Sequence, residues 1–314
     1  MPITYDAPSG GEAPVGPTLD DGGFELDGFL FGGENDSVVI QPGGFDPGTT
    51  DWRVQDQDSP SGDGVVFGRD LLAGQTWGFT FLTNEYTAAD ALNSLEAMAG
   101  LWLNNASRSV PGAVSVLRYN IGGRVRRVYG RPRRWGLAVT PDLWGGVAPV
   151  VADFRCEGAL HYDDELRTID VGVVVGDGAS SGGMSEPLSA PLSTVGGGAR
   201  SGVIDVVGGT APAPFIALIH GPITNPWVAG PGWRFDFLTT LAYNQSLAVD
   251  TRPWAKTVLR NDGASLAGTL TRTSTALSDA RLLPGGGAWL DFGGIDGTGT
   301  ATCAVSWRPT YHSL

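Results

Sequence analysis

The chain has 314 residues, and the 48 Gly and 21 Pro among them argue against a mainly helical protein. Hydrophobic residues make up 41% of the sequence, which is enough for a packed core and excludes an intrinsically disordered chain. The net charge of −13 opposes sequence-independent binding to nucleic acid. No apolar run is long enough to cross a membrane as a helix.

Charge is distributed unevenly along the first half of the chain. Residues 1–70 carry 14 acidic side chains against two arginines, whereas residues 118–134 carry seven arginines and no acid. Arginine forms bidentate pairs with carboxylates, so we expect the basic run to meet the acidic stretch of a neighbouring copy. The candidate interface residues are Arg118, Arg124, Arg126, Arg127, Arg131, Arg133 and Arg134. The alternative is a nucleic-acid surface that also uses the interleaved Tyr119, Tyr129 and Trp135, and the net charge opposes it.

The first elements are short. Residues 1–23 are rich in Pro, Gly and Asp, which predicts an extended arm. The segments 24–33 and 35–44 are bounded by turn signals and favour an arm or hairpin over a core.

A strand and the main helix of the chain are predicted next. Trp77, Phe79 and Phe81 alternate with smaller residues, which indicates a half-buried strand. Residues 87–103 have a capping-box-like start at Thr87 and apolar residues at helical spacing, which predicts a helix. The apolar residues of this helix are Leu92, Leu95, Ala99 and Trp102.

The rest of the chain has the pattern of short strands. Residues 112–162 contain three strand-like segments, and residues 176–202 form a connector rich in Gly and Ser. Short apolar segments separated by Pro, Gly, Asn and Asp follow at the spacing of a β-sandwich. We therefore predict a mainly β protein with an α+β domain over residues 1–178, which holds the main helix, and a β-sandwich domain over residues 179–314.

No combination of residues indicates catalysis. Residues 178–182 match the Gly-x-Ser-x-Gly pattern of hydrolases, but they lie in the connector and no helix follows them. None of the three histidines is recognisably paired with a Ser or Cys nucleophile. The acidic run at residues 163–165 is typical of a solvated turn or an interface. Cys156 and Cys303 alternate with polar neighbours, as small core residues do. We expect neither an enzyme nor a cofactor or metal site.

The order of motifs over residues 118–314 resembles that of the siphovirus-type distal tail protein (Dit) family. In the second half the matching positions are Gly208-Gly209-Thr210, Pro214, residues 221–226, Asp250-Thr251, Leu283-Pro284-Gly285 and residues 307–311. In the first half, RVRRVYGRPRRW resembles the basic strand pair of the family, FRCEGALHYDDE its aromatic-acidic turn and GGMSEPLSAPL its connector. Gly208 departs from the pattern, because the family has Asn there.

The resemblance implies a structural virion protein of a phage tail tip, assembled in the host bacterial cytoplasm. It implies an N-terminal ring-forming domain, usually hexameric, and a galectin-like C-terminal sandwich. The expected partners are further copies of the chain, the tail tube protein and the tail-tip hub, with the tape measure or receptor-binding proteins as additional candidates. DNA would pass through the bore during ejection, and no membrane insertion is expected.

An alternative function is carbohydrate binding during host adsorption, because a galectin-like sandwich is also a scaffold for sugar sites. Trp227, Trp233 and Trp254 are the candidate residues that would stack on a pyranose ring.

Overall fold

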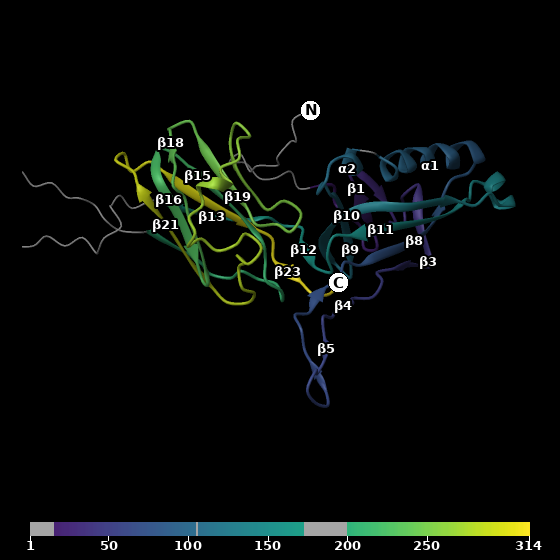
Figure 1. Cartoon of the computed structure of the whole chain (residues 1–314). Coiled ribbons are helices and arrows are strands. Elements are labelled where there is room, and N and C mark those ends of the chain that lie inside the picture. Colours follow the sequence, from purple (N-terminus) through teal and green to yellow (C-terminus); the bar gives the residue numbers. More distant parts are fainter. Residues whose placement is uncertain (1–15, 105, 173–199) are drawn as a thin grey trace, which may run out of the picture. The chain divides into compact units, whose positions relative to one another are not determined.

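The computed structural model describes residues 16–104, 106–172 and 200–314 of the chain (Figure 1). The described residues form two compact units. Unit 1 runs to Asp164 and also contains His312–Leu314, and unit 2 spans Glu165–Tyr311. The division therefore lies earlier than the predicted boundary at residue 178, which is outside the described residues. It lies there because strand β13 (Arg167–Gly172) pairs with β22 (Thr302–Trp307) of unit 2.

Unit 1 consists of a β-sheet with one long helix. Its strands are β1 (Phe24–Leu26), β2 (Phe29–Phe31), β3 (Val38–Asp46), β4 (Trp52–Arg53), β5 (Gln57–Asp58), β6 (Val65–Val66), β7 (Leu71–Leu72), β8 (Thr76–Thr83), β9 (Ser115–Ile121), β10 (Arg124–Leu137), β11 (Pro149–Cys156) and β12 (His161–Asp163). Its helices are α1 (Ala88–Trp102), the single turn α2 (Ala106–Ser109) and a 3-10 helix (Pro141–Gly145).

The sheet of unit 1 is antiparallel along the order β2-β1-β9-β10-β11-β8-β3, and β12 also pairs with β10. The outer strands of this path approach each other. The amide of Gly32, just after β2, donates to the carbonyl of Val38 at 2.8 Å, and Gly32 and Val39 form an isolated bridge. The sheet therefore curls around its core.

Helix α1 covers part of the sheet of unit 1 (Figure 1). Thr87 caps it by accepting a hydrogen bond from the amide of Asp90, as the capping pattern predicts. Its buried face consists of Ala91, Leu95, Met98 and Trp102, whereas Leu92 is exposed. The predicted helix is confirmed. Its buried stripe is rotated about the helix axis relative to the predicted one, so that Leu92 lies outside it.

The segment around β1 and β2 belongs to the core of unit 1. The two strands form the predicted hairpin, but Phe24 and Phe31 are buried and pack on Phe79. The expectation of a hairpin outside a core was wrong, because β1 also pairs with β9 and turns its aromatic side chains inward. A three-residue strand is too short for its alternation to reveal this in the sequence.

Unit 2 is a β-sandwich. One sheet has the order β13-β22-β15-β19-β20, the other has the order β14-β21-β16-β17, and β18 pairs with β16. The remaining elements are β14 (Arg200–Ile204), β15 (Phe215–His220), β16 (Ile223–Gly230), β17 (Trp233–Asp236), β18 (Thr240–Leu241), β19 (Ser246–Asp250), β20 (Thr257–Arg260), a 3-10 helix (Ala267–Thr269), β21 (Ala288–Ile295) and β23 (Thr310–Tyr311).

The inner faces of the two sheets in unit 2 form one hydrophobic core. Phe215 on β15 packs on Trp233 on β17, with 4.5 Å between their ring centroids. Cys303 is buried here and Cys156 is buried in unit 1, so both free cysteines are the small core residues predicted. The mainly β fold class is confirmed. None of the helices in the described residues has the length and hydropathy of a membrane-spanning helix.

Candidate subunit interface

The seven candidate arginines lie on β9 and β10, which form a hairpin. Gly122 and Gly123 make its turn at φ values of 61° and 73°, a region that favours glycine. The arginines divide into two groups by their surroundings. Arg118, Arg126, Arg127 and Arg131 are buried or half-buried within unit 1, whereas Arg124, Arg133 and Arg134 are exposed.

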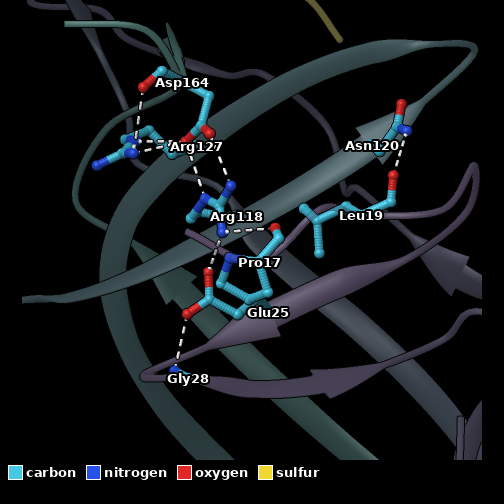
Figure 2. A network of polar contacts seen from close by, with 8 residues as sticks. All are labelled: Pro17, Leu19, Glu25, Gly28, Arg118, Asn120, Arg127 and Asp164. Carbon is cyan, nitrogen blue, oxygen red and sulfur yellow. Dashed lines mark hydrogen bonds and ion pairs between the residues drawn. The ribbon is translucent and has the colours of Figure 1, made fainter. Parts of the chain in front are cut away.

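Arg118 is the centre of a buried ion-pair network (Figure 2). Its Nε and Nη2 donate to the two carboxylate oxygens of Asp164 at 2.9 and 2.7 Å, which is bidentate geometry. Its Nη1 donates to Oε2 of Glu25 at 2.6 Å and to the carbonyl of Pro17 at 3.3 Å. The other oxygen of Glu25 accepts from the amide of Gly28. The guanidinium thus joins β9, β1 and the segment after β12.

Asp164 receives a second arginine. Arg127 donates to Oδ1 of Asp164 from Nε at 3.0 Å and from Nη2 at 2.5 Å, and to its carbonyl oxygen. Burial would raise the pKa of Asp164, but the hydrogen bonds and charges of Arg118 and Arg127 outweigh it and lower the pKa to about 2. The hydrogen bond to Asp164 raises the pKa of Arg118. Asp164 and Arg118 are therefore both charged at neutral pH.

Two further arginines satisfy backbone carbonyls of unit 1. Nη1 of Arg126 donates to the carbonyl of Ser313 at 2.6 Å. Arg131 donates to the carbonyls of Ala113 and Val110 at 2.7 and 2.8 Å. These hydrogen bonds hold connecting segments of unit 1 against β10, so both side chains are used within the unit.

The structure therefore gives part of the arginine run an intrachain role that the sequence did not predict. Arg118 and Arg126 are 6% and 8% exposed, so their side chains are not available to a neighbouring copy. Asp164 is half-buried and held in two ion pairs, which corrects the interpretation of residues 163–165 as a solvated turn or interface for this one residue, while Glu165 is exposed. Sequence reasoning did not identify Glu25 as the partner of Arg118. The signal that could have indicated it is a single carboxylate between the apolar residues Phe24 and Leu26.

Arg133 and Arg134 lie in a β-bulge. The register of β10 with β11 shifts between Pro132 and Trp135, so these two arginines lie opposite the single residue Asp153. The carbonyl of Arg134 accepts a hydrogen bond from Nε1 of Trp102, which fixes the backbone there. Within the described residues, no carboxylate forms an ion pair with either arginine or with Arg124 at the hairpin turn. These three arginines remain the candidate interface.

His161 is a structural residue of unit 1. It is 2% exposed, its Nδ1 lies 2.7 Å from the hydroxyl of Tyr119, and its ring stacks on Trp77. Burial, together with the charge of Arg126, lowers its pKa to about 4. The neutral form is therefore favoured, as expected for a satisfied core histidine. Burial also raises the pKa of the Cys156 thiol to about 12, so this thiol is protonated at neutral pH.

The three candidate tryptophans of unit 2 have different surroundings. Trp233 is 4% exposed and packs on Phe215 and Phe235, so it cannot stack on a sugar, and this candidate was wrong. The ring of Trp227 is half-buried and has the guanidinium of Arg234 over it at 4.2 Å. Trp254 is half-buried with the guanidinium of Arg252 at 5.6 Å from its ring.

No group of three or more metal-ligating side chains occurs in the part of the chain that the structure describes. The Gly-x-Ser-x-Gly match at residues 178–182 lies outside the described residues. What unit 1 offers is therefore three exposed arginines on β10, together with a network in which Arg118 and Arg127 are paired with carboxylates.

Comparisons with known proteins give the following result. The sequence matches no family model, and no curated protein matches it. Among solved structures, the Dit protein of phage SPP1 is similar, with a TM-score of 0.55 and 14% identity over 92% of this chain and 98% of that chain. It is described as a paradigm of the hub adsorption apparatus in phages that infect Gram-positive bacteria. A chain of the phage P2 baseplate in its activated conformation with Ca has a TM-score of 0.49 and 11% identity over 90% of this chain and 97% of that chain. The chain thus has the fold of a distal tail protein, as the sequence resemblance predicts.

Proposed function

We propose that the chain is a structural protein of a phage tail tip, a distal tail protein that joins the tail tube to the tip hub. In this proposal unit 1 assembles with further copies into a ring, hexameric in the usual form of the family. Unit 2 is the docking appendage for other tail-tip proteins. The protein acts in the virion after assembly in the host cytoplasm, and its role is architectural rather than catalytic.

The observation that carries the proposal is the likeness to the SPP1 Dit protein. It extends over 92% of this chain and 98% of the other, so both units take part in it. Fold alone does not determine function, and the ring depends on the chemistry of the surface of unit 1.

That surface fits association between unlike patches. The exposed Arg124, Arg133 and Arg134 have no carboxylate in ion-pair contact within the described residues, while residues 16–70 include many exposed acidic side chains. Contact between two different patches is heterologous and closes into a ring when the rotation between copies permits.

The internal use of four arginines also supports passage of DNA through the bore. A basic bore would bind phosphates and retain DNA. Arg118 and Arg127 are neutralised by Glu25 and Asp164, and the chain as a whole carries a charge of −13. Such a protein would let DNA slide past with little attraction.

The test is the assembly state of the purified full-length chain. Native mass spectrometry together with negative-stain microscopy should give a closed annulus, with six copies. A chain that stays monomeric at every concentration, and that does not form a ring with its neighbours in purified virions, would contradict the proposal. An annulus with another copy number would correct the stoichiometry alone.

A further inference from the structure

A narrow hairpin projects from the sheet of unit 1 (Figure 1). We call residues 51–72 the arm. Its two legs pair at the base through β4 with β7 and further out through β5 with β6. Every side chain from Asp51 to Asp70 is exposed except that of Ser59. The arm therefore contributes nothing to the core of unit 1.

The arm carries an unusual amount of exposed apolar surface. Phe67 is 84% exposed and Val54 is 61% exposed, followed by Trp52 at 59%, Val66 at 57% and Val65 at 48%. Single exposed apolar residues are common, but a group of this kind on one element marks an interaction site. A two-stranded ribbon without a core is also marginally stable in water. The arm thus needs a surface that covers it.

The charge of the arm indicates what covers it. The arm has five aspartates, Asp51, Asp56, Asp58, Asp63 and Asp70. Against them stand Arg53 and Arg69. None of these aspartates forms an ion pair in the described part of the chain. A covering surface with basic groups at its edge would therefore be complementary.

Such basic groups are present on the same unit. Arg124, Arg133 and Arg134 are exposed, and none of them has an ion-pair partner within the described residues. Arg133 and Arg134 are adjacent in the bulge and both are exposed, so two neighbouring guanidinium groups are available at the surface. In a single copy no ion pair joins these arginines to the arm. A contact between the arm and these arginines would therefore be made between copies.

We propose that the arm of one copy docks on β10 of a second copy, at the exposed pair Arg133 and Arg134. The inference rests on the proposed ring and identifies the two patches that close it. Each leg of the arm has about ten residues, and an extended chain of that length reaches about 30 Å, enough to leave its own unit. The apolar residues around Phe67 would fill the centre of the contact, and the aspartates would meet the arginines at its rim.

The experiment compares four variants of the full-length chain with the wild type by sedimentation velocity. The first replaces residues 54–69 by an Asn-Gly turn, which keeps β4 and β7 and removes exposed side chains together with the half-buried Ser59. The second is Asp56→Lys with Asp58→Lys, and the third is Arg133→Glu with Arg134→Glu. The fourth combines the second and third. A matched control is Asp205→Lys with Asp279→Lys, which reverses two exposed carboxylates of unit 2.

The proposal expects the shortened arm to leave the chain monomeric at concentrations at which the wild type assembles, with an unchanged melting temperature. Each charge reversal should weaken assembly, the combined variant should recover part of it, and the control should assemble like the wild type. High salt should also weaken assembly, because the rim pairs are screened. Full assembly of the shortened variant would overturn the arm contact and leave the proposed ring intact, whereas a monomeric wild type would contradict the ring itself.

A photo-cross-linker placed at position 67 gives an independent readout. Cross-links to the peptide that contains Arg133 and Arg134, formed between two copies of different isotopic label, support the proposal. Cross-links confined to one copy, or to another region of the second copy, overturn it.

Discussion

Arg118 and Glu25 lie directly opposite each other on the paired strands β9 and β1, and Nη1 of the arginine lies 2.6 Å from Oε2 of the carboxylate. Their side chains are 7% and 11% exposed. The pair is therefore buried, and Asp164 supplies the second negative charge. Charges removed from water in this way stabilise the fold only as a complete set, because each partner left alone would be a buried, uncompensated ion.

The first prediction concerns this set. Arg118→Met leaves Glu25 and Asp164 without their shared cation, and we expect it to lower the free energy of unfolding of unit 1 by about 3–5 kcal/mol. Urea denaturation of the full-length chain measures the effect. Arg124→Met is the matched control, since Arg124 is exposed at the hairpin turn and its loss should change stability by about 0.5 kcal/mol or less. Equal midpoints for the two variants would contradict the assignment.

The second prediction concerns pH. His161 has a pKa of about 4 in the folded chain against an ordinary value of 6.5, so the unfolded chain binds its proton first as the pH falls. Stability is therefore complete above pH 6.5 and decreases between pH 6.5 and 4, by about 3 kcal/mol in total. His161→Gln removes the titrating group, and thermal unfolding of this variant should depend less on pH over that interval. A slope as steep as that of the wild type would contradict the prediction.

The third prediction separates core from surface tryptophans. Trp233→Ala creates a cavity between Phe215 and Phe235, and we expect unit 2 to lose about 3–5 kcal/mol of stability. Trp254→Ala removes a half-buried ring and should cost much less. Calorimetry measures both. Any carbohydrate binding lost in the Trp233 variant would therefore report unfolding, so a sugar site must be tested through Trp227 and Trp254.

The fourth prediction distinguishes the two groups of arginines. Arg126→Glu with Arg127→Glu puts two acids beside Asp164 and the carbonyl of Ser313, so this variant should fail to fold rather than merely fail to assemble. Arg133→Glu with Arg134→Glu changes exposed side chains and should melt like the wild type. Circular dichroism and sedimentation velocity on both variants measure these outcomes. A well-folded, fully assembled Arg126 and Arg127 variant would contradict the buried network.

Sequence patterns predicted the regular elements because their periodicity is local. The main helix, its cap at Thr87 and the strand containing Trp77 are confirmed, since capping and alternation depend on neighbours in the chain. The core position of Phe24 and the early end of unit 1 at Asp164 depend on strand pairing across long sequence distances. Local patterns carry no information about such pairing.

The arginines illustrate the same limit at the candidate site. Seven arginines in seventeen residues indicate an interface by composition, but the sequence cannot tell which of them face Glu25 and Asp164. The bulge at Arg133 and Arg134 is likewise set by the register with β11. The arm was missed because Val65, Val66 and Phe67 look like any short apolar segment, and only the structure places them outside a core.

Residues 312–314 return to unit 1 after the whole of unit 2 has been traversed, and there Arg126 binds the carbonyl of Ser313 while Leu314 packs against the aromatic core. When the first 164 residues have left the ribosome during synthesis, unit 1 still lacks residues 312–314. Unit 1 can reach its final state only after unit 2 has been synthesised, so completion of the two units is coupled in time as well as in sequence.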